Sequence, residues 1–531
     1  MAPVTENEVL RVAKAVGFDV PESELSDYAE LLGRAQEAFE AVVNCEDYQP
    51  TPDLDVAPRT DVHFPDVKDN PHNGWAWRCH CVHAQPVSDL LSGKTLCLKD
   101  NIAMADVPCL LGTESFTGWV PATDATVVTR LLENGGTIMG KAVCENLSRG
   151  AVSCTAATGP VHNPYAPCYS AGGSSSGTAA LVASGAVDMG IGCDQGGSIR
   201  IPAALCGLYG FKATTGLVPY TGIASNDAAV DYVGPITTSC SDCAILLQAI
   251  AGADGLDDRQ GPGTPLLSHV PAYRDLLLWQ PSADNKEAAY GAGPLQGMRI
   301  GVLVEGLASS LLDAGVATSF HRAVDGFAAL GAVVSEVSVP MHTRGRSIYT
   351  VMSKMGNHMG MLGQATGRRQ VLLTDLLACK GLPYTPAAVA KMSTASKEGL
   401  LAGSYGWARY PLAYAKSVNL MRQLQDAYDA ALLSVDFLVM PTTITPSSPL
   451  PPADASPRVH VLASAGKLEN TSQFNGTGHP ALAMPIGLVP AKTDPSLRLP
   501  ASLQIVGKFF DEARILQAAY AWESAYDWKT M

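Results

Sequence analysis

The sequence predicts an α/β fold in which strands alternate with helices, preceded by a helical N-terminal region. Three observations lead to this prediction. Hydrophobic residues make up 47% of the 531 residues and charged residues only 16%, which indicates a large buried core. The 50 glycines and 36 prolines indicate many turns. From about residue 75 onward, short apolar strand patterns alternate with amphipathic helix patterns.

The N-terminal region carries two helix patterns. Thr5 and Glu8 form a capping box, in which each side chain satisfies a free backbone N–H of the first turn. Gly17 suits the end of this helix, and a second amphipathic run covers residues 25–42. A segment rich in proline and aspartate then leads into the rest of the chain. We therefore expect a boundary near residue 70.

The remaining chain alternates between the two kinds of pattern. A first helix is expected from Asp124, its N-cap, to residue 136, with further helices at 317–331 and 511–526. Strands are expected at 94–102, 137–143, 187–194, 297–306, 332–340, 436–443, 479–488 and 501–507. The expected organisation is a helical region (1–70), a first core segment (71–262), a smaller inserted α/β domain (263–405) and a second core segment (406–531).

Charge and cysteine content exclude several classes of partner. The net charge is −14 and no Lys/Arg cluster occurs, so no nucleic-acid partner is expected. No stretch reaches the about 18 uninterrupted apolar residues of a membrane span, and the N-terminus lacks the apolar core of a secretory signal. We therefore expect no membrane partner. Thirteen cysteines, an odd number, fit free thiols in a cytoplasmic protein.

The first glycine–serine loop, "GGSSSG", precedes a run of small helix-forming residues. A phosphate-binding loop is not indicated, because no G-x-x-x-x-G-K-[ST] motif occurs. Gly173, Ser175 and Gly177 satisfy G-x-S-x-G, the nucleophile elbow, although the residues before them do not have a strand pattern. A tight packing loop without chemistry is the remaining interpretation.

The second loop, "DQGGSIR", follows the buried strand pattern "VDMGIGCD". Consecutive glycines allow positive φ angles and a close approach of backbone N–H groups to a ligand. Several such groups pointing inward can hold an oxyanion. Ser198, at the end of this loop, is a candidate nucleophile, and an ordinary strand-to-helix turn is the alternative.

A serine nucleophile needs a base. None of the eleven histidines stands in an obvious triad motif. A buried lysine is the other option, because loss of solvent disfavours the charged ammonium form. Lys99 follows the apolar run "TLCL" at a strand end and is the candidate; the alternative is a surface lysine paired with Asp100.

These motifs together resemble the amidase signature family. The resemblance rests on "LKDNI", "GGSSSGTAALVASG", "DQGGSIRIPAALCGLYGFK", "GPVHNPY", "FLVMPTT", "TGHPALAMPIG" and "LQIVGKFFDEA", and covers roughly residues 75–260 and 410–525. The interval of 24 residues from Ser174 to Ser198 is similar to that between the family's two catalytic serines. The resemblance implies that family's fold: a mixed β-sheet core flanked by helices, with a helical N-terminal region and a smaller inserted α/β domain. Among family members, it is closest to nitrile-pathway amidases.

Carried over residue by residue, the resemblance implies a catalytic triad. Ser198 would be the nucleophile, Lys99 the base, and Ser174 the relay between them, following a cis peptide bond from Gly173. The backbone N–H groups of the loop would form the oxyanion hole; these belong to Gln195, Gly196, Gly197 and Ser198. Asp194 and Arg200 would brace the loop as an ion pair. The implied reaction requires no metal and no organic cofactor.

The acyl pocket is where the sequence departs from the family. Ser148, Arg149 and Gln195 are the candidate substrate-binding residues. The family usually has an apolar residue at or near Ser148 and Arg149. An inward Arg149 would favour an acidic or polar acyl group, and an outward one would imply nothing. We expect it to point outward, because an unpaired buried guanidinium is costly.

The resulting functional prediction is a hydrolase that cleaves the C–N bond of small amides to a carboxylate and ammonia through an acyl-enzyme. Two alternatives remain open: a carbamate (urethane) hydrolase with the same triad, and the catalytic subunit of a tRNA-dependent amidotransferase. The expected partner is a small-molecule amide, and the N-terminal helices are candidates for joining two copies into a homodimer.

Overall fold

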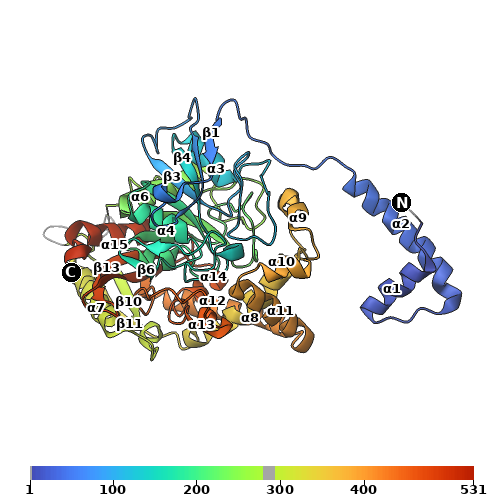
Figure 1. Ribbon diagram of the computed structural model, residues 1–531. Helices are drawn as coiled ribbons and strands as arrows, with labels where there is room; N and C mark the ends of the chain where they lie inside the picture. Colours follow the sequence, from blue (N-terminus) through green and yellow to red (C-terminus); the bar gives the residue numbers. More distant parts are fainter. Residues whose placement is uncertain (1–2, 279–292) are drawn as a thin grey trace. The chain divides into compact units, whose positions relative to one another are not determined.

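The structure is a computed structural model that describes residues 3–278 and 293–531. The chain forms two compact units, Met1–Pro50 and Thr51–Met531. Both units are drawn in Figure 1, with the colours following the sequence. The division falls at Pro50 rather than near residue 70, because strand β1 (Arg59–His63) already pairs with β2 (Trp75–Cys81) of the second unit.

The first unit consists of helices α1 (Glu6–Val16) and α2 (Leu25–Val43). The Thr5 hydroxyl accepts a hydrogen bond from the Glu8 N–H (3.3 Å), as expected of the N-cap. The Glu8 carboxylate binds Arg11 instead of completing the capping box. Gly17 ends α1 in the left-handed conformation. The two helix patterns of the N-terminal sequence are thus confirmed.

The second unit is built on one mixed sheet of twelve strands, in the order β1-β2-β4-β3-β7-β9-β8-β13-β14-β12-β10-β11. The other strands of this sheet are β3 (Thr95–Lys99), β4 (Thr137–Ala142), β7 (Met189–Asp194), β8 (Tyr209–Lys212), β9 (Tyr232–Thr237), β10 (Arg299–Leu303), β11 (Val333–Val337), β12 (Phe437–Pro441), β13 (Ala481–Pro490) and β14 (Arg498–Gly507). A separate pair is formed by β5 (His162–Asn163) and β6 (Ala166–Ser170). The predicted strands and the mixed α/β architecture are confirmed.

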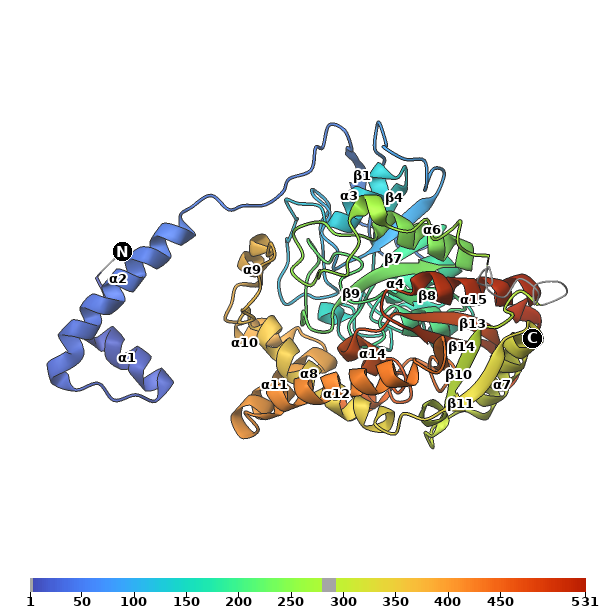
Figure 2. The ribbon, with the colours of Figure 1, turned by 180° about the vertical axis from the view of Figure 1, so that it is seen from behind.

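Alternate residues of the central strands enter different cores on the two faces of the sheet. In β12, Phe437 and Val439 pack in one core, whereas Leu438 and Met440 pack in another. This follows from the period of two in a strand. Helices therefore cover both faces, as the two views of the molecule show (Figures 1 and 2).

The helices of the second unit are α3 (Thr126–Glu133), α4 (Ser176–Ala183), α5 (Arg200–Leu205), α6 (Cys240–Ile250), α7 (Ala314–Ala329), α8 (His342–Met361), α9 (Thr374–Lys380), α10 (Pro386–Ala390), α11 (Thr394–Arg409), α12 (Ala413–Ala431), α13 (Pro457–Leu462), α14 (Ser472–Thr477) and α15 (Glu512–Ala525). The N-cap of α3 is Ala125, not Asp124. The Asp124 carboxylate instead pairs with Arg59 and accepts from the Ala105 N–H, so a tertiary contact replaces the expected local cap.

The segment 263–405 does not separate as a unit of its own. Its strands β10 and β11 extend the main sheet through parallel pairing of β10 with β12. Its helices α8 and α11 pack against each other, and α8 also packs on α12 (Figure 2). The inserted sequence thus adds one sheet edge and a helical group to the core. Within the described ranges, no helix is long and apolar enough to cross a bilayer.

Helix α4 lies directly on β7 because the strand presents glycine to it. Met189, Ile191 and Cys193 of β7 point into the core on the other face. A Cβ atom at Gly190 would approach the Thr178 side chain of α4 more closely than real Cβ atoms do. The glycines of "MGIGCD" therefore allow the loop before α4 and the loop after β7 to lie together.

Candidate active site

Lys99 is the last residue of β3, and its side chain is fully buried. In "TLCLK", Leu96 and Leu98 point into one core and Cys97 into the other, so the period of two places Lys99 on the face that carries α4. Its Nζ lies 2.7 Å from Ser174 Oγ and 3.3 Å from the Cys193 carbonyl oxygen. Lys99 is therefore not a surface lysine.

Ser174 belongs to the loop that precedes α4 and is also fully buried. The peptide bond between Gly173 and Ser174 is cis, as the family resemblance implies. The Ser174 carbonyl oxygen accepts a hydrogen bond from the Glu145 N–H (3.1 Å). The Glu145 carboxylate in turn accepts from the Val152 N–H (3.0 Å) and binds Thr155, which ties this loop to the segment that follows β4.

Asp194 and Arg200 form a buried ion pair across the second loop, with Arg200 Nε 3.0 Å from Asp194 Oδ2. Burial raises the pKa of Asp194, but the adjacent Arg200 guanidinium outweighs it and holds the pKa at about 2. Arg200 also donates to Gln504 Oε1 (2.7 Å) and Asn475 Oδ1 (2.7 Å), which lie about 300 residues further along the chain. The pair thus anchors the loop to the C-terminal part of the core.

The backbone of the second loop is held by side chains from distant elements. The Tyr349 hydroxyl of α8 donates to the Gln195 carbonyl (2.6 Å), and the Thr471 hydroxyl donates to the Gly196 carbonyl (2.7 Å). Gly197 has φ +135°, a conformation that glycine adopts readily. These contacts fix the orientations of the peptide planes between the two ends of the loop.

One of the four amides expected in the oxyanion hole is already engaged. The Gly197 N–H donates to Asp194 Oδ1 at 2.6 Å, so it satisfies the brace of the loop and is not free for a substrate oxygen. The physical reason is that the buried Asp194 carboxylate needs hydrogen-bond donors, and the amide three residues later is within reach. The amides of Gln195, Gly196 and Ser198 remain the candidates.

Ser198 stands where the two loops meet. Its carbonyl oxygen accepts from the Ser175 N–H (3.3 Å), and Ser198 lines a cavity of about 590 Å³. Ser175 does not line this cavity. The Ser175 hydroxyl is fully buried and bonds both the carbonyl oxygen (3.1 Å) and the N–H (3.2 Å) of Cys193. Ser175 is therefore a structural residue, and the nucleophile-elbow interpretation is wrong.

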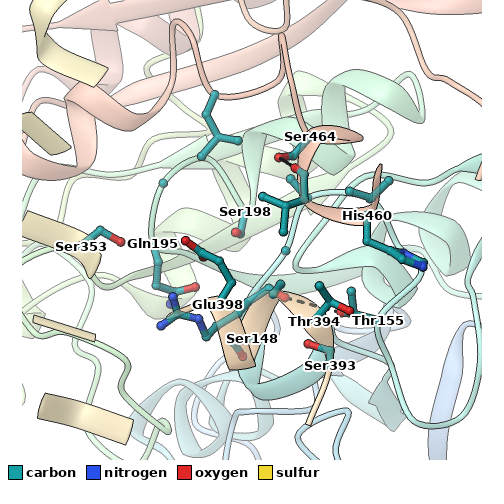
Figure 3. A pocket seen from close by; sticks show the side chains of 18 of the residues that line it. Ser148, Thr155, Gln195, Ser198, Ser353, Ser393, Thr394, Glu398, His460 and Ser464 are labelled. Carbon is teal, nitrogen blue, oxygen red and sulfur yellow. Dashed lines mark hydrogen bonds between the residues drawn. The ribbon is translucent and has the colours of Figure 1, made fainter. Parts of the chain in front are cut away.

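The cavity has the size of a small-molecule site and draws its walls from both core segments and the insertion. Figure 3 shows the labelled lining side chains: Ser148, Thr155, Gln195 and Ser198 from the core, Ser353 from α8, Ser393, Thr394 and Glu398 from the start of α11 and the residue before it, and His460 and Ser464 from α13 and the residues after it. Gln195 Nε2 donates to the Tyr220 hydroxyl (3.0 Å), whereas its Oε1 has no partner among the described residues.

Arg149 also lines this cavity, which corrects the expectation that it points outward. Its guanidinium packs against Met361 Sδ (Nη1 to Sδ, 3.5 Å) and Gly399 of α11. Burial lowers the pKa of Arg149, and the nearby Glu398 opposes this shift. The expectation failed because the insertion, which is distant in sequence, covers this side chain and gives it an inward position.

Sequence reasoning missed several residues that shape the site. Glu145 and Thr471 lie in segments without a recognisable motif, and Tyr349 lies in an amphipathic helix pattern with nothing local to distinguish it. Their contacts with the two loops span up to 275 residues. A local signal existed only for Glu145, a carboxylate in an otherwise apolar stretch after β4.

The chain resembles known amidases in sequence. The Amidase family profile matches residues 80–516. An enantioselective amidase of Rhodococcus rhodochrous is 33% identical over 471 residues, which cover 87% of this chain and 84% of the relative. One of the subunits of the glutamyl-tRNA(Gln) amidotransferase of Caldanaerobacter subterraneus is 31% identical over 444 residues, which cover 82% of this chain and 83% of the relative.

Solved structures agree with this placement. The peptide amidase from Stenotrophomonas maltophilia superposes with a TM-score of 0.64 at 28% identity, covering 82% of this chain and 83% of that one. A 6-aminohexanoate cyclic dimer hydrolase superposes with a TM-score of 0.68 at 23% identity, covering 83% of this chain and 86% of that one, which is a likeness of fold alone. The family profile spans most of the chain, and the protein therefore belongs to the amidase (amidase signature) family.

Proposed function

We propose that this protein is a serine hydrolase that cleaves small amides to a carboxylate and ammonia through an acyl-enzyme. The observation that carries the proposal is the buried contact of 2.7 Å between Lys99 Nζ and Ser174 Oγ, in a loop that touches Ser198 at the wall of a cavity. A buried amine that has no ion-pair partner in the described part of the chain suits a base that must be neutral to accept a proton.

The proposed acylation step uses the three side chains in series. Lys99 accepts the hydroxyl proton of Ser198 through Ser174, and Ser198 Oγ forms a bond to the amide carbon. The amides of Gln195, Gly196 and Ser198 would stabilise the oxyanion, and removal of one such donor typically costs about 3 kcal/mol of transition-state stabilisation. The relay returns the proton to the leaving nitrogen as the C–N bond breaks, so ammonia leaves rather than an amide anion.

The proposed deacylation step reverses the direction of the relay. Water gives a proton through Ser174 to Lys99, and its oxygen attacks the acyl carbon. The ester bond to Ser198 breaks, and Ser198 regains a proton. The proposed reaction therefore consumes one water for each ammonia and carboxylate released, with no metal and no organic cofactor, in a cytoplasmic protein.

Ammonia release from benzamide and propionamide by the purified chain tests this function. Ser198→Ala should abolish release, whereas Ser175→Ala, which removes the neighbouring structural hydroxyl, should retain at least about a tenth of the rate because general acid–base and nucleophilic groups are unchanged. Turnover by Ser198→Ala, or a loss confined to Ser175→Ala, would contradict the proposal.

Two related functions are distinguished by the same assay. A carbamate hydrolase with the same triad would release ammonia from ethyl carbamate faster than from either amide. The component of a tRNA-dependent amidotransferase, which the likeness to the glutamyl-tRNA(Gln) enzyme keeps in view, would release little ammonia without its complex. Hydrolysis of simple amides by the isolated chain would favour the amidase over both.

We also propose that the first unit joins two copies of the chain. Its helices expose large apolar side chains, among them Phe39 (68% exposed), Val42 (74%) and Val43 (82%) of α2. Apolar patches of this kind are typical of interaction surfaces. Light scattering should give a dimer for the full chain and a monomer for a Phe39→Glu, Val42→Glu double variant. A monomeric full chain would contradict this part of the proposal.

A further inference from the structure

The walls of the cavity that Ser198 lines carry an excess of positive charge. Apart from His460, its charged lining residues are three cations, Arg149, Arg346 and Lys354, and one carboxylate, Glu398. Arg346 is paired with Glu469, and Lys354 is paired with Glu398. Arg149 has no ion-pair partner within the described ranges. The charge excess of the cavity therefore resides on Arg149.

The guanidinium of Arg149 is only partly satisfied by the protein. Its Nη1 lies 3.5 Å from Met361 Sδ, a weak acceptor. Its Nε is buried and has no hydrogen-bond partner among the described residues. Glu398 is close enough to favour the charged form, but burial outweighs this effect and lowers the pKa of Arg149. A buried cation in this state gains strongly from an added anion, because charge-assisted hydrogen bonds are about twice as strong as neutral ones.

Helix α11 has a glycine where the guanidinium lies. A Cβ atom at Gly399 would stand 2.6 Å from Arg149 Cζ, closer than real Cβ atoms come to other atoms. The backbone at this position is helical, and no local feature of the helix requires glycine. The glycine therefore makes room for the inward guanidinium, and a methyl group there would displace it without removing its charge.

From these observations we infer that Arg149 binds a carboxylate of the substrate, so that the preferred substrates are amides that carry a second, acidic group, such as monoamides of dicarboxylic acids. This inference rests on the proposed amide hydrolysis at Ser198. A planar guanidinium binds a carboxylate through two parallel N–H donors, which selects for it over a neutral group of the same shape. Hydrolysis of such a monoamide adds one water, breaks the C–N bond and releases ammonia and the dicarboxylate.

The first experiment compares two isosteric substrates, 4-carbamoylbenzoate and 4-isopropylbenzamide, by their kcat/KM values. The wild-type protein should favour the acid, and Arg149→Met should lower the acid-to-neutral ratio by about 10- to 100-fold, the range expected for loss of a hydrogen bond to a charged group. Arg149→Lys should lose part of the ratio. Gly399→Ala should lower it as well, although every charge is retained.

Arg346→Met is the matched control, because it removes a cation from the same cavity wall that Glu469 already satisfies. It should leave the acid-to-neutral ratio within about 3-fold of wild type, since screening by its partner leaves little net charge to lose. An unchanged ratio in Arg149→Met, a wild-type preference for the neutral amide, or an equal loss in Arg346→Met would overturn the inference.

A binding experiment separates this inference from the proposed function. Terephthalate is titrated calorimetrically into the Ser198→Ala variant and into the Ser198→Ala, Arg149→Met double variant. Binding about 10-fold or more weaker in the double variant supports the carboxylate site even if neither amide is hydrolysed, which would contradict only the proposed function. Equal binding in a double variant with a wild-type circular dichroism spectrum overturns the inference. If the methionine variant does not fold, the same comparison with Gly399→Ala decides.

Discussion

Lys141 Nζ lies 3.6 Å from Asp100 Oδ1, and both side chains are buried beside the candidate active site. Asp100 Oδ2 also accepts the Leu110 N–H (2.9 Å). The carboxylate that follows Lys99 in the sequence is therefore compensated by a lysine of the neighbouring strand. This arrangement leaves the Lys99 amine facing Ser174, as the proposed base requires.

The first prediction concerns the pH dependence of stability. Burial raises the pKa of Asp100 to about 6, although Lys141 opposes the shift. A folded pKa above the unfolded value of about 3.9 means that the group favours folding below that value and loses this contribution as the pH rises through about 6. Asp100→Asn does not titrate. The unfolding free energy of wild type relative to Asp100→Asn should therefore fall between about pH 4 and about pH 6, as measured by urea denaturation. A rise over this window would contradict the prediction.

The second prediction concerns the proposed base. Lys99→Met keeps the length of the side chain but removes the amine, and it should lower kcat for amide hydrolysis by about 10²- to 10⁴-fold, the usual contribution of general acid–base catalysis. Lys212→Met is the control, because Lys212 is another buried lysine that does not line the cavity. A rate above one tenth of wild type in Lys99→Met would exclude Lys99 as the base.

The third prediction concerns the brace of the second loop. Arg200→Met leaves Asp194 without its buried counterion, and breaking such a pair typically lowers the unfolding free energy by about 3–5 kcal/mol. Chemical denaturation near neutral pH measures the loss. Arg200→Lys should lose part of this amount, because one ammonium cannot reach Asp194, Gln504 and Asn475 together. Unchanged stability combined with lost activity would instead indicate that Arg200 contacts the substrate.

The fourth prediction concerns Tyr349, whose hydroxyl fixes the Gln195 carbonyl. Tyr349→Phe removes one neutral hydrogen bond worth about 0.5–1.5 kcal/mol, so kcat should fall by about 2- to 12-fold if this bond orients the loop. Tyr428→Phe is a matched control, because that buried hydroxyl bonds His342 outside the cavity. Equal effects of the two changes would point to a general loss of stability.

The sequence could predict the strands and the loops because their signals are local. "TLCLK" and "VDMGIGCD" show apolar strand patterns that end in polar residues, and β3 and β7 pair in parallel, so these ends meet at one edge of the sheet. The positions of Lys99 and of the second loop follow from this. Their proposed roles come from the family resemblance and stay predictions until the variants are measured.

The orientation of Arg149 and the place of Asp124 could not be predicted because distant elements decide them. Met361 and Gly399 lie more than 200 residues after Arg149, and nothing near Arg149 in the sequence indicates that α8 and α11 cover it. Asp124 has the residue type of an N-cap, but its ion pair with Arg59 is a stronger contact in a buried position. Tertiary contacts override local preferences in both cases.

The most direct test of the proposed nucleophile is to identify the serine that reacts with a fluorophosphonate. After incubation of the intact protein with the reagent, digestion and mass spectrometry locate the covalent adduct. We predict a single adduct on Ser198, which is lost or strongly slowed in Lys99→Met. An adduct on Ser175 or on a serine outside the cavity, with Ser198 unmodified, would contradict the proposed mechanism.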